Sequence, residues 1–201
     1  MAFETVTMKK TCRGSAFLKE NKYDDSVFFE QYSHMPRSEQ GLSAAGEWPA
    51  LKALLPELAG KRVLDLGCGS GILSIAALLL GADRAVACDI DEKCMDVAYE
   101  NAALNGVGRD RYTVRWGDVV TDRALRRELG GPYDVVVANI VADVIIPLSA
   151  QVPALLAEDG VFLCSGIIDD RAQEVADRLR ENGWEILETR SAEGWFSYLC
   201  R

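Results

Sequence analysis

The stretch RVLDLGCGSGILSIAALLLGADRAVACDID, residues 62–91, decides the fold. It opens with an apolar run that ends in the glycine cluster GCGSG, continues with helix-forming residues, and closes on a second apolar run that ends in Asp89. An apolar run followed by glycine is typical of a buried parallel strand, and glycine lets the backbone turn sharply toward a ligand. The stretch therefore predicts a strand–helix–strand unit with a nucleotide site at the glycine loop.

The same alternation of strand and helix continues downstream. Strands are predicted at 62–67, 84–89, 112–116, 133–140 and 160–166, and helices at 70–81, 91–106, 121–130, 142–160 and 169–183. Pro147 and Pro153 interrupt the fourth helical stretch, which is expected to form one or two helices. The final stretch, 184–201, holds two β runs separated by SAEG, a hairpin pattern. We expect an α/β fold with a Rossmann-like, doubly wound, seven-stranded sheet that is mostly parallel, with an antiparallel strand in the C-terminal hairpin.

The first sixty residues do not share this alternation. They are rich in aromatic residues and predict two helices, at about 24–33 and 47–58. Residues 1–22 show no clear pattern and are expected to be flexible. We interpret residues 23–60 as a helical lid on a cofactor-binding core at 61–201, so that residues 1–201 form a single domain.

Composition excludes several classes of protein. The net charge of −9 argues against a nucleic-acid partner, because phosphate contacts need clustered Lys and Arg. The longest apolar run, from Ile72 to Leu80, is shorter than the roughly 20 residues of a transmembrane helix, and no secretory signal is visible at the start. The six cysteines are scattered, and the single histidine is far from them, so neither a metal site nor a disulfide framework is expected. Reduced thiols indicate a cytoplasmic location.

The spacing of the glycines argues against a dinucleotide. The dinucleotide fingerprint is GxGxxG, whereas this loop reads GxGxG and places Ile72 where the third glycine of the fingerprint would stand. Asp65, just before the loop, would repel a pyrophosphate but would suit an ammonium group. Asp89 lies 22 positions after Gly67, where a carboxylate can accept both ribose hydroxyls. The structural alternatives are a glycine turn without a ligand and an Asp89 that only caps the next helix.

This pattern resembles motif I of the class I S-adenosylmethionine-dependent methyltransferases. The resemblance implies S-adenosylmethionine, or its product S-adenosylhomocysteine, as the cofactor. The segment GDV at 117–119, after the third strand, is similar to the adenine-binding segment of that class, and its aspartate would accept the exocyclic amine; by itself the segment could be a simple turn. The cofactor contacts implied in the core are Asp65, Gly67, Gly69, Gly71, Asp89, Ile90, Asp118, Val119 and Asn139.

Residues 62–201 further resemble the catalytic domain of the PrmA-type ribosomal protein methyltransferases, which methylate amino groups of a large-subunit ribosomal protein. The segment most specific to that family is NIVA at 139–142. At this position the family carries Asn-Ile-Leu-Ala, and other amino-methylating enzymes carry Asn-Pro-Pro-Tyr. The resemblance implies that Asn139 is catalytic, because an amide oxygen at a strand end can hold an attacking amine near the methyl group. The alternative is a turn-forming asparagine after a buried strand.

The first sixty residues depart from that family. Its separate substrate-recognition domain and its Gly-Thr-Gly-Thr-His segment are not found before the glycine loop. Residues 23–70 instead resemble the start of small-molecule class I methyltransferases, whose N-terminal helices fold over the cofactor. By that resemblance Tyr32 and Met35 line its methionine end, and Arg37 pairs with its carboxylate. The chain thus reads as two relatives joined near 61–71, a possible chimera.

Methyl transfer to an amino nitrogen is the function that these features favour. The expected partner is a basic ribosomal protein or a small amine, with neither nucleic acid nor membrane involved. His34 could act as a base, but Asn139 and bulk solvent would suffice. The alternatives are a cofactor-binding scaffold or chimera without an efficient substrate, a small-molecule methyltransferase, and, least favoured, a nicotinamide-dependent oxidoreductase.

Overall fold

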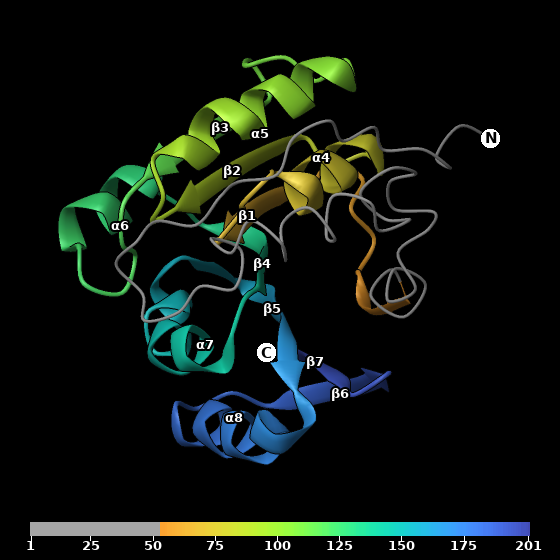
Figure 1. The fold of residues 1–201 in the computed structure, drawn as a ribbon, viewed down its shortest axis with the longest axis vertical. Helices are drawn as coiled ribbons and strands as arrows, with labels where there is room; N and C mark the ends of the chain where they lie inside the picture. Colours follow the sequence, from red (N-terminus) through yellow and green to blue (C-terminus); the bar gives the residue numbers. More distant parts are fainter. Residues whose placement is uncertain (1–52) are drawn as a thin grey trace, which may run out of the picture.

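The computed structural model describes residues 53–201, which form one seven-stranded sheet with helices on both faces (Figure 1). The strand order is β3-β2-β1-β4-β5-β7-β6. The strands are β1 Arg62–Leu66, β2 Arg84–Asp89, β3 Tyr112–Trp116, β4 Tyr133–Asn139, β5 Leu156–Ile168, β6 Ile186–Ala192 and β7 Trp195–Cys200. Strand β7 runs antiparallel to β5 and β6, and the pairings among β1 to β5 are parallel. The expected Rossmann-like sheet with an antiparallel C-terminal strand is confirmed.

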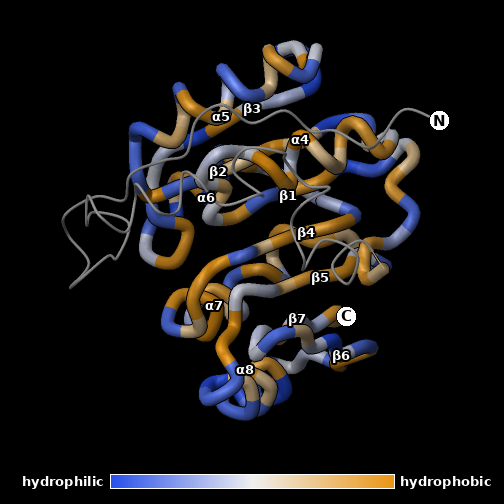
Figure 2. Tube along the Cα trace, turned by 45° about the vertical axis from the view of Figure 1, so that its right-hand side comes forward, coloured by the Kyte–Doolittle hydropathy of each residue, from blue (hydrophilic) through white to orange (hydrophobic). Residues whose placement is uncertain are grey.

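The helices divide the core into two layers. They are α4 Ile72–Leu79, α5 Lys93–Leu104, α6 Arg123–Leu129, α7 Ala142–Ser149 and α8 Asp169–Glu181, with a short 3-10 turn at Val152–Ala154. Buried residues of α4 and α5 pack on one face of the sheet, and those of α6, α7 and α8 pack on the other. Figure 2 shows apolar residues along the central strands and polar residues on the outward side of α8. Because both faces are covered, successive residues of β1 and β4 are buried alike.

The stretch between β4 and α8 differs from its prediction. Helix α7 runs through Pro147, which lacks the N–H that would bond to the carbonyl four residues earlier, and the helix ends two residues later. The short 3-10 turn begins at Val152 and has Pro153 as its second residue, and β5 starts at Leu156 instead of residue 160. Leu156 pairs with Tyr133 at the start of β4, and a register shift follows. The polar residues after Leu156 are therefore the first part of a long strand and not the end of a helix.

The part of the predicted helix at 47–58 that lies within the described residues is shorter than predicted. Ala53 and Leu54 are helical, but residues 55–58 are not, because Pro56 disfavours the helical conformation of the residue before it. Leu54 and Leu58 are nonetheless buried against the α4 face of the sheet. The predicted helix at 24–33 and most of the lid at 23–60 lie outside the described residues.

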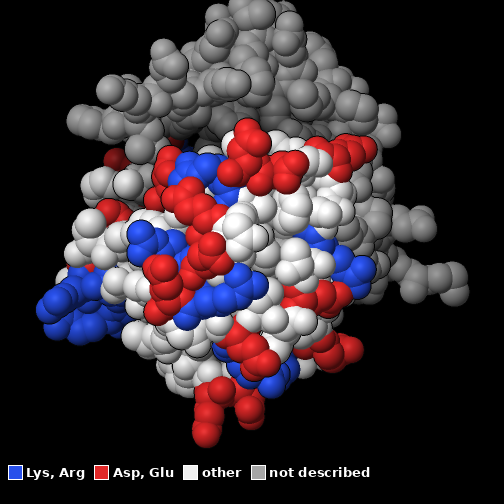
Figure 3. All heavy atoms as spheres, turned by 90° about the horizontal axis from the view of Figure 1, so that it is seen from below, with Lys and Arg blue, Asp and Glu red and all other residues white. Residues whose placement is uncertain are grey.

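Charges of both signs alternate over the end of the molecule that α8 covers (Figure 3). Arg171 contacts Asp143 of α7 and Glu174 of its own helix, and further along α8 Arg178 pairs with Glu181. Such exposed pairs each contribute about 0–1 kcal/mol, so they add little to stability. Within residues 53–201 no helix is long and apolar enough to cross a membrane, and no cluster of three metal-ligating side chains is found.

Candidate cofactor and acceptor site

The carboxyl ends of the parallel strands meet at one edge of the sheet, and the strand order reverses there between β1 and β4. In open α/β sheets this switch point is where ligands bind. The loop after β1 crosses this edge and is tied to β2. The backbone N–H groups of Gly67 and Cys68 both donate to the carbonyl of Cys88, at 2.8 and 3.1 Å. Gly67, Gly69 and Gly71 all have positive φ angles, of 72°, 50° and 81°, which explains why glycine stands at these three positions.

Asp89 ends β2 beside this loop, as predicted. One of its carboxylate oxygens accepts the backbone N–H of Gly69 at 2.8 Å, and the other accepts that of Asp91 at 2.9 Å. Each oxygen keeps a lone pair for another donor. Ile90, the next residue, is 59% exposed at the same edge. Asp91 is buried and accepts the N–H of Lys93, the first residue of α5, so the helix begins two residues later than predicted.

Asp65 lies underneath the glycine loop and not on its open side. Its side chain is 1% exposed, and one oxygen accepts both the backbone N–H and the hydroxyl of Ser74 in α4, at 3.1 and 2.6 Å. The other oxygen has no hydrogen-bond partner within the described part of the chain. Burial raises the pKa of Asp65 to about 6, the hydrogen bonds from Ser74 oppose that shift, and the nearby Asp89 adds to it.

Replacing Asp65 with asparagine should stabilise the protein without ligand at pH 7. The folded state prefers the protonated carboxyl, so at pH 7 ionisation penalises folding, and this penalty fades as the pH falls through 6 toward the unfolded pKa. A shift of the pKa from its ordinary value to about 6 corresponds to a penalty of about 3 kcal/mol on the stability of the folded state. Urea unfolding should show that Asp65→Asn has a higher free energy of unfolding than wild type. The difference should be large at pH 7 and clearly smaller at pH 5. Equal stability at pH 7 would show that burial does not penalise this carboxylate.

The segment after β3 is ordered by its own aspartate. The Asp118 carboxylate accepts the backbone N–H of Val120 at 2.8 Å and the hydroxyl of Thr121 at 2.7 Å, and its oxygens retain further lone pairs. The side chain of Val119 points into the core and is 6% exposed. A cofactor contact at Val119 would therefore come from its backbone. Sequence reasoning overlooked Trp116, whose indole N–H donates to the carbonyl of Ile90 at 3.0 Å.

Asn139 ends β4 and is exposed at the same edge. The following residue, Ile140, brings it to the glycine loop, because a Cβ atom added to Gly67 would overlap the side chain of Ile140. Gly166, in β5, has a φ of 81°, and a Cβ there would lie 2.6 Å from the side-chain oxygen of Asn139. Two glycines thus make room for the NIVA segment, which places the predicted catalytic asparagine next to the predicted cofactor loop.

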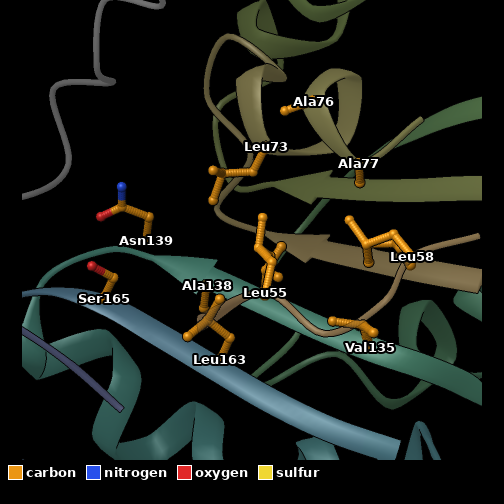
Figure 4. Close-up of a pocket in the computed structure, with 12 residues that line it drawn as sticks. Leu55, Leu58, Leu73, Ala76, Ala77, Val135, Ala138, Asn139, Leu163 and Ser165 are labelled. Carbon is orange, nitrogen blue, oxygen red and sulfur yellow. The ribbon is translucent and has the colours of Figure 1, made fainter. Parts of the chain in front are cut away.

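Figure 4 shows Asn139 and Ser165 at one end of a hollow on the α4 face of the sheet. The rest of the hollow is apolar, with Leu55, Leu73 and Leu163 among its lining residues. Ser165 was not predicted as a site residue. Its only signal in the sequence is its position at the end of the strand run GVFLCSG, beside the end of the asparagine strand. The predicted lid residues Tyr32, Met35 and Arg37, and also His34, lie outside the described residues.

A glycine loop at the switch point, an acidic residue at the end of β2 and an antiparallel seventh strand together define a Rossmann-like fold of the class I methyltransferase type. The sequence profile described as ribosomal protein L11 methyltransferase (PrmA) matches residues 50–201. The chain belongs to this family. The match begins upstream of the expected join at 61–71, and the chimera stays a prediction.

Individual relatives agree with this assignment. The ribosomal protein L11 methyltransferase of Agathobacter rectalis is 40% identical over 150 residues, which is 72% of this chain and 46% of the relative. That of Thermotoga maritima is 38% identical over 75% of this chain and 53% of its own length. The chain thus spans about half the length of these relatives. The crystal structure of ribosomal protein L11 methylase from Lactobacillus delbrueckii subsp. bulgaricus superposes with a TM-score of 0.67, at 32% identity over 76% of this chain and 74% of that one.

Proposed function

We propose that this chain is an S-adenosylmethionine-dependent methyltransferase that acts on an amino nitrogen, with ribosomal protein L11 as the acceptor. The observation that carries the proposal is the contact of Ile140 with Gly67, because it sets Asn139 beside the cofactor loop. The curated relatives and the crystallised relative are named for L11. A side-chain or N-terminal amine of that protein can donate a hydrogen bond to the amide oxygen of Asn139.

The residues at the sheet edge fit the parts of this cofactor. The two lone pairs left on Asp89 suit the two ribose hydroxyls, and exposed Ile90 offers an apolar surface to the adenine. Asp65 retains one unpartnered buried oxygen behind the loop, which suits the methionine ammonium or a water molecule that bridges to it. Among distant structural neighbours that share the fold, SMU.776 was crystallised with S-adenosylhomocysteine, at 14% identity and a TM-score of 0.66.

The acceptor amine must arrive without its extra proton, since a protonated nitrogen has no lone pair to react. Asn139 can accept one N–H of the neutral amine and so turn its lone pair toward the loop. S-adenosylmethionine supplies a methyl group that its sulfonium has already activated, and the electrons of the broken S–C bond remain on sulfur. The proton of the resulting ammonium passes to solvent, which reaches the exposed Asn139.

The surface around Asn139 suits an alkyl chain. Val141 is 59% exposed directly after the NIVA asparagine and isoleucine, and Ile168 and Trp195 are paired in register at the same edge with 47% and 50% exposure. A lysine side chain carries four methylene groups that such a surface would shield from water. These exposed apolar side chains at the edge therefore favour a lysine over a short, highly polar amine.

Binding and transfer assays together test this function. Calorimetry should show binding of S-adenosylmethionine and S-adenosylhomocysteine but not of NAD, and saturation at about 100 times the dissociation constant should add roughly 2.7 kcal/mol to stability. Labelled methyl should then pass from the cofactor to purified L11. Transfer only to small amines would favour the small-molecule alternative, and binding without any transfer would favour the scaffold. Binding of NAD alone would overturn the proposal.

A further inference from the structure

Strand β5 carries a bulge beside the asparagine. Cys164 pairs with Tyr198, and Ile167 pairs with Phe196, so that two residues of β5 stand opposite the single residue Ser197 of β7. Those two residues are Ser165 and Gly166, and the positive φ of the glycine permits the bulge. A bulge changes the direction of a side chain at the end of a strand, and bulges recur next to active sites.

This bulge leaves Ser165 with a defined orientation next to Asn139. The two residues are partners in the register of β4 and β5, and the carbonyl of Ser165 accepts the N–H of Ile140 at 3.1 Å. The hydroxyl of Ser165 lies 2.7 Å from that of Ser197, and both are half-buried. In Figure 4 the side chains of Asn139 and Ser165 lie near each other at one end of the hollow. Ser165 can donate its proton to Ser197 and keep its lone pairs for a ligand.

An attacking primary amine needs two acceptors. It has two N–H bonds besides its lone pair, and if each N–H has a partner, the lone pair has only one direction left. Asn139 supplies one carbonyl oxygen at the end of β4. Within the described residues, the hydroxyl of Ser165 is the side-chain acceptor that the neighbouring strand end adds. A buried N–H left without an acceptor costs about 1–3 kcal/mol, so the second acceptor affects both binding and orientation.

We propose that Ser165, oriented by Ser197, is a second positioning residue for the acceptor amine and shares its N–H groups with Asn139. The inference rests on the proposed function, because it presumes an amine at this edge. It assigns a role in the reaction to the β5 bulge and to a hydroxyl pair that belongs to neither the glycine loop nor the NIVA segment.

Sinefungin tests this assignment without the protein acceptor. It is an analogue of S-adenosylmethionine that carries an amine where the sulfonium carries its methyl, so its amine should meet the proposed acceptors. Calorimetry should show that Ser165→Ala lowers the affinity for sinefungin about tenfold and leaves the affinity for S-adenosylhomocysteine unchanged. Ser165→Thr keeps the hydroxyl and should bind both ligands like wild type. Ser197→Ala should weaken sinefungin less than Ser165→Ala does.

The matched control is Ser191→Ala, which removes an exposed hydroxyl of β6 and should change neither affinity. The inference would be overturned if Ser165→Ala bound sinefungin as tightly as wild type, or if it lost equal affinity for both ligands. If wild type binds S-adenosylhomocysteine but does not methylate L11, the proposed substrate fails while the sinefungin comparison still decides the role of Ser165. If wild type binds neither ligand, the proposed function and the inference fail together.

Discussion

Asp89→Ala is expected to lower the affinity for S-adenosylmethionine at least tenfold. The change removes the acceptors proposed for both ribose hydroxyls, and a hydrogen bond to a charged group contributes about 1.5–3 kcal/mol. It also removes the carboxylate that holds the backbone N–H of Gly69, so the glycine loop loses a tether. Calorimetry with S-adenosylmethionine measures the affinity directly.

Asp91→Ala is the matched control, two residues away on the same segment. Asp91 accepts the N–H of Lys93 at the start of α5, so its loss should lower the free energy of unfolding by about 1 kcal/mol, the contribution of one hydrogen bond. Its effect on cofactor affinity should be small. Equal losses of affinity in the two variants would show that Asp89 does not have the special role assigned to it.

Asn139→Ala is expected to slow methyl transfer about a hundredfold, with cofactor affinity nearly unchanged. The side chain is exposed at the edge, so its removal leaves no cavity, and the loss falls on alignment of the amine with the methyl group. Single-turnover transfer to L11 at saturating cofactor isolates this step. Asn182→Ala, which removes an asparagine at the end of α8, is the control and should transfer at the wild-type rate. A wild-type rate for Asn139→Ala would remove this residue from the mechanism.

The local sequence pattern predicted most strands of the sheet, because each strand is marked by its own run of apolar residues. Strands β2 and β3 have the predicted bounds, since each is a short apolar run between turns or helices. The start of β5 was placed too late, because its first residues are polar and pair only with the beginning of β4. Alternation along one strand cannot show such a pairing. The helix predicted at 47–58 departs for a local reason instead, because Pro56 disfavours the helical conformation of the residue before it.

The site was predictable where it depended on position along a strand. The glycine loop, Asp89 and Asn139 all lie at strand ends, and the sheet brings strand ends together. The surroundings of each side chain were not predictable. For Asp65, position along the strand did not show that Ser74 donates two hydrogen bonds to its carboxylate beneath the glycine loop.

Ser165 was missed for a related reason. Its orientation comes from a bulge in the pairing of β5 with β7, and only the register of two strands far apart in the sequence shows that bulge. The hydroxyl pair with Ser197 depends on the same register.

The most direct test of the central claim is the mass of L11 after incubation with this chain and S-adenosylmethionine. We expect L11 to gain the mass of one or more methyl groups, which peptide mapping places on lysine side chains or on the N-terminal amine. The same incubation with Asn139→Ala should leave L11 almost unmodified. If wild type bound the cofactor and L11 kept its original mass, or if the methyl groups lay on oxygen or carbon, the account of an amine-directed site at the ends of β4 and β5 would be contradicted.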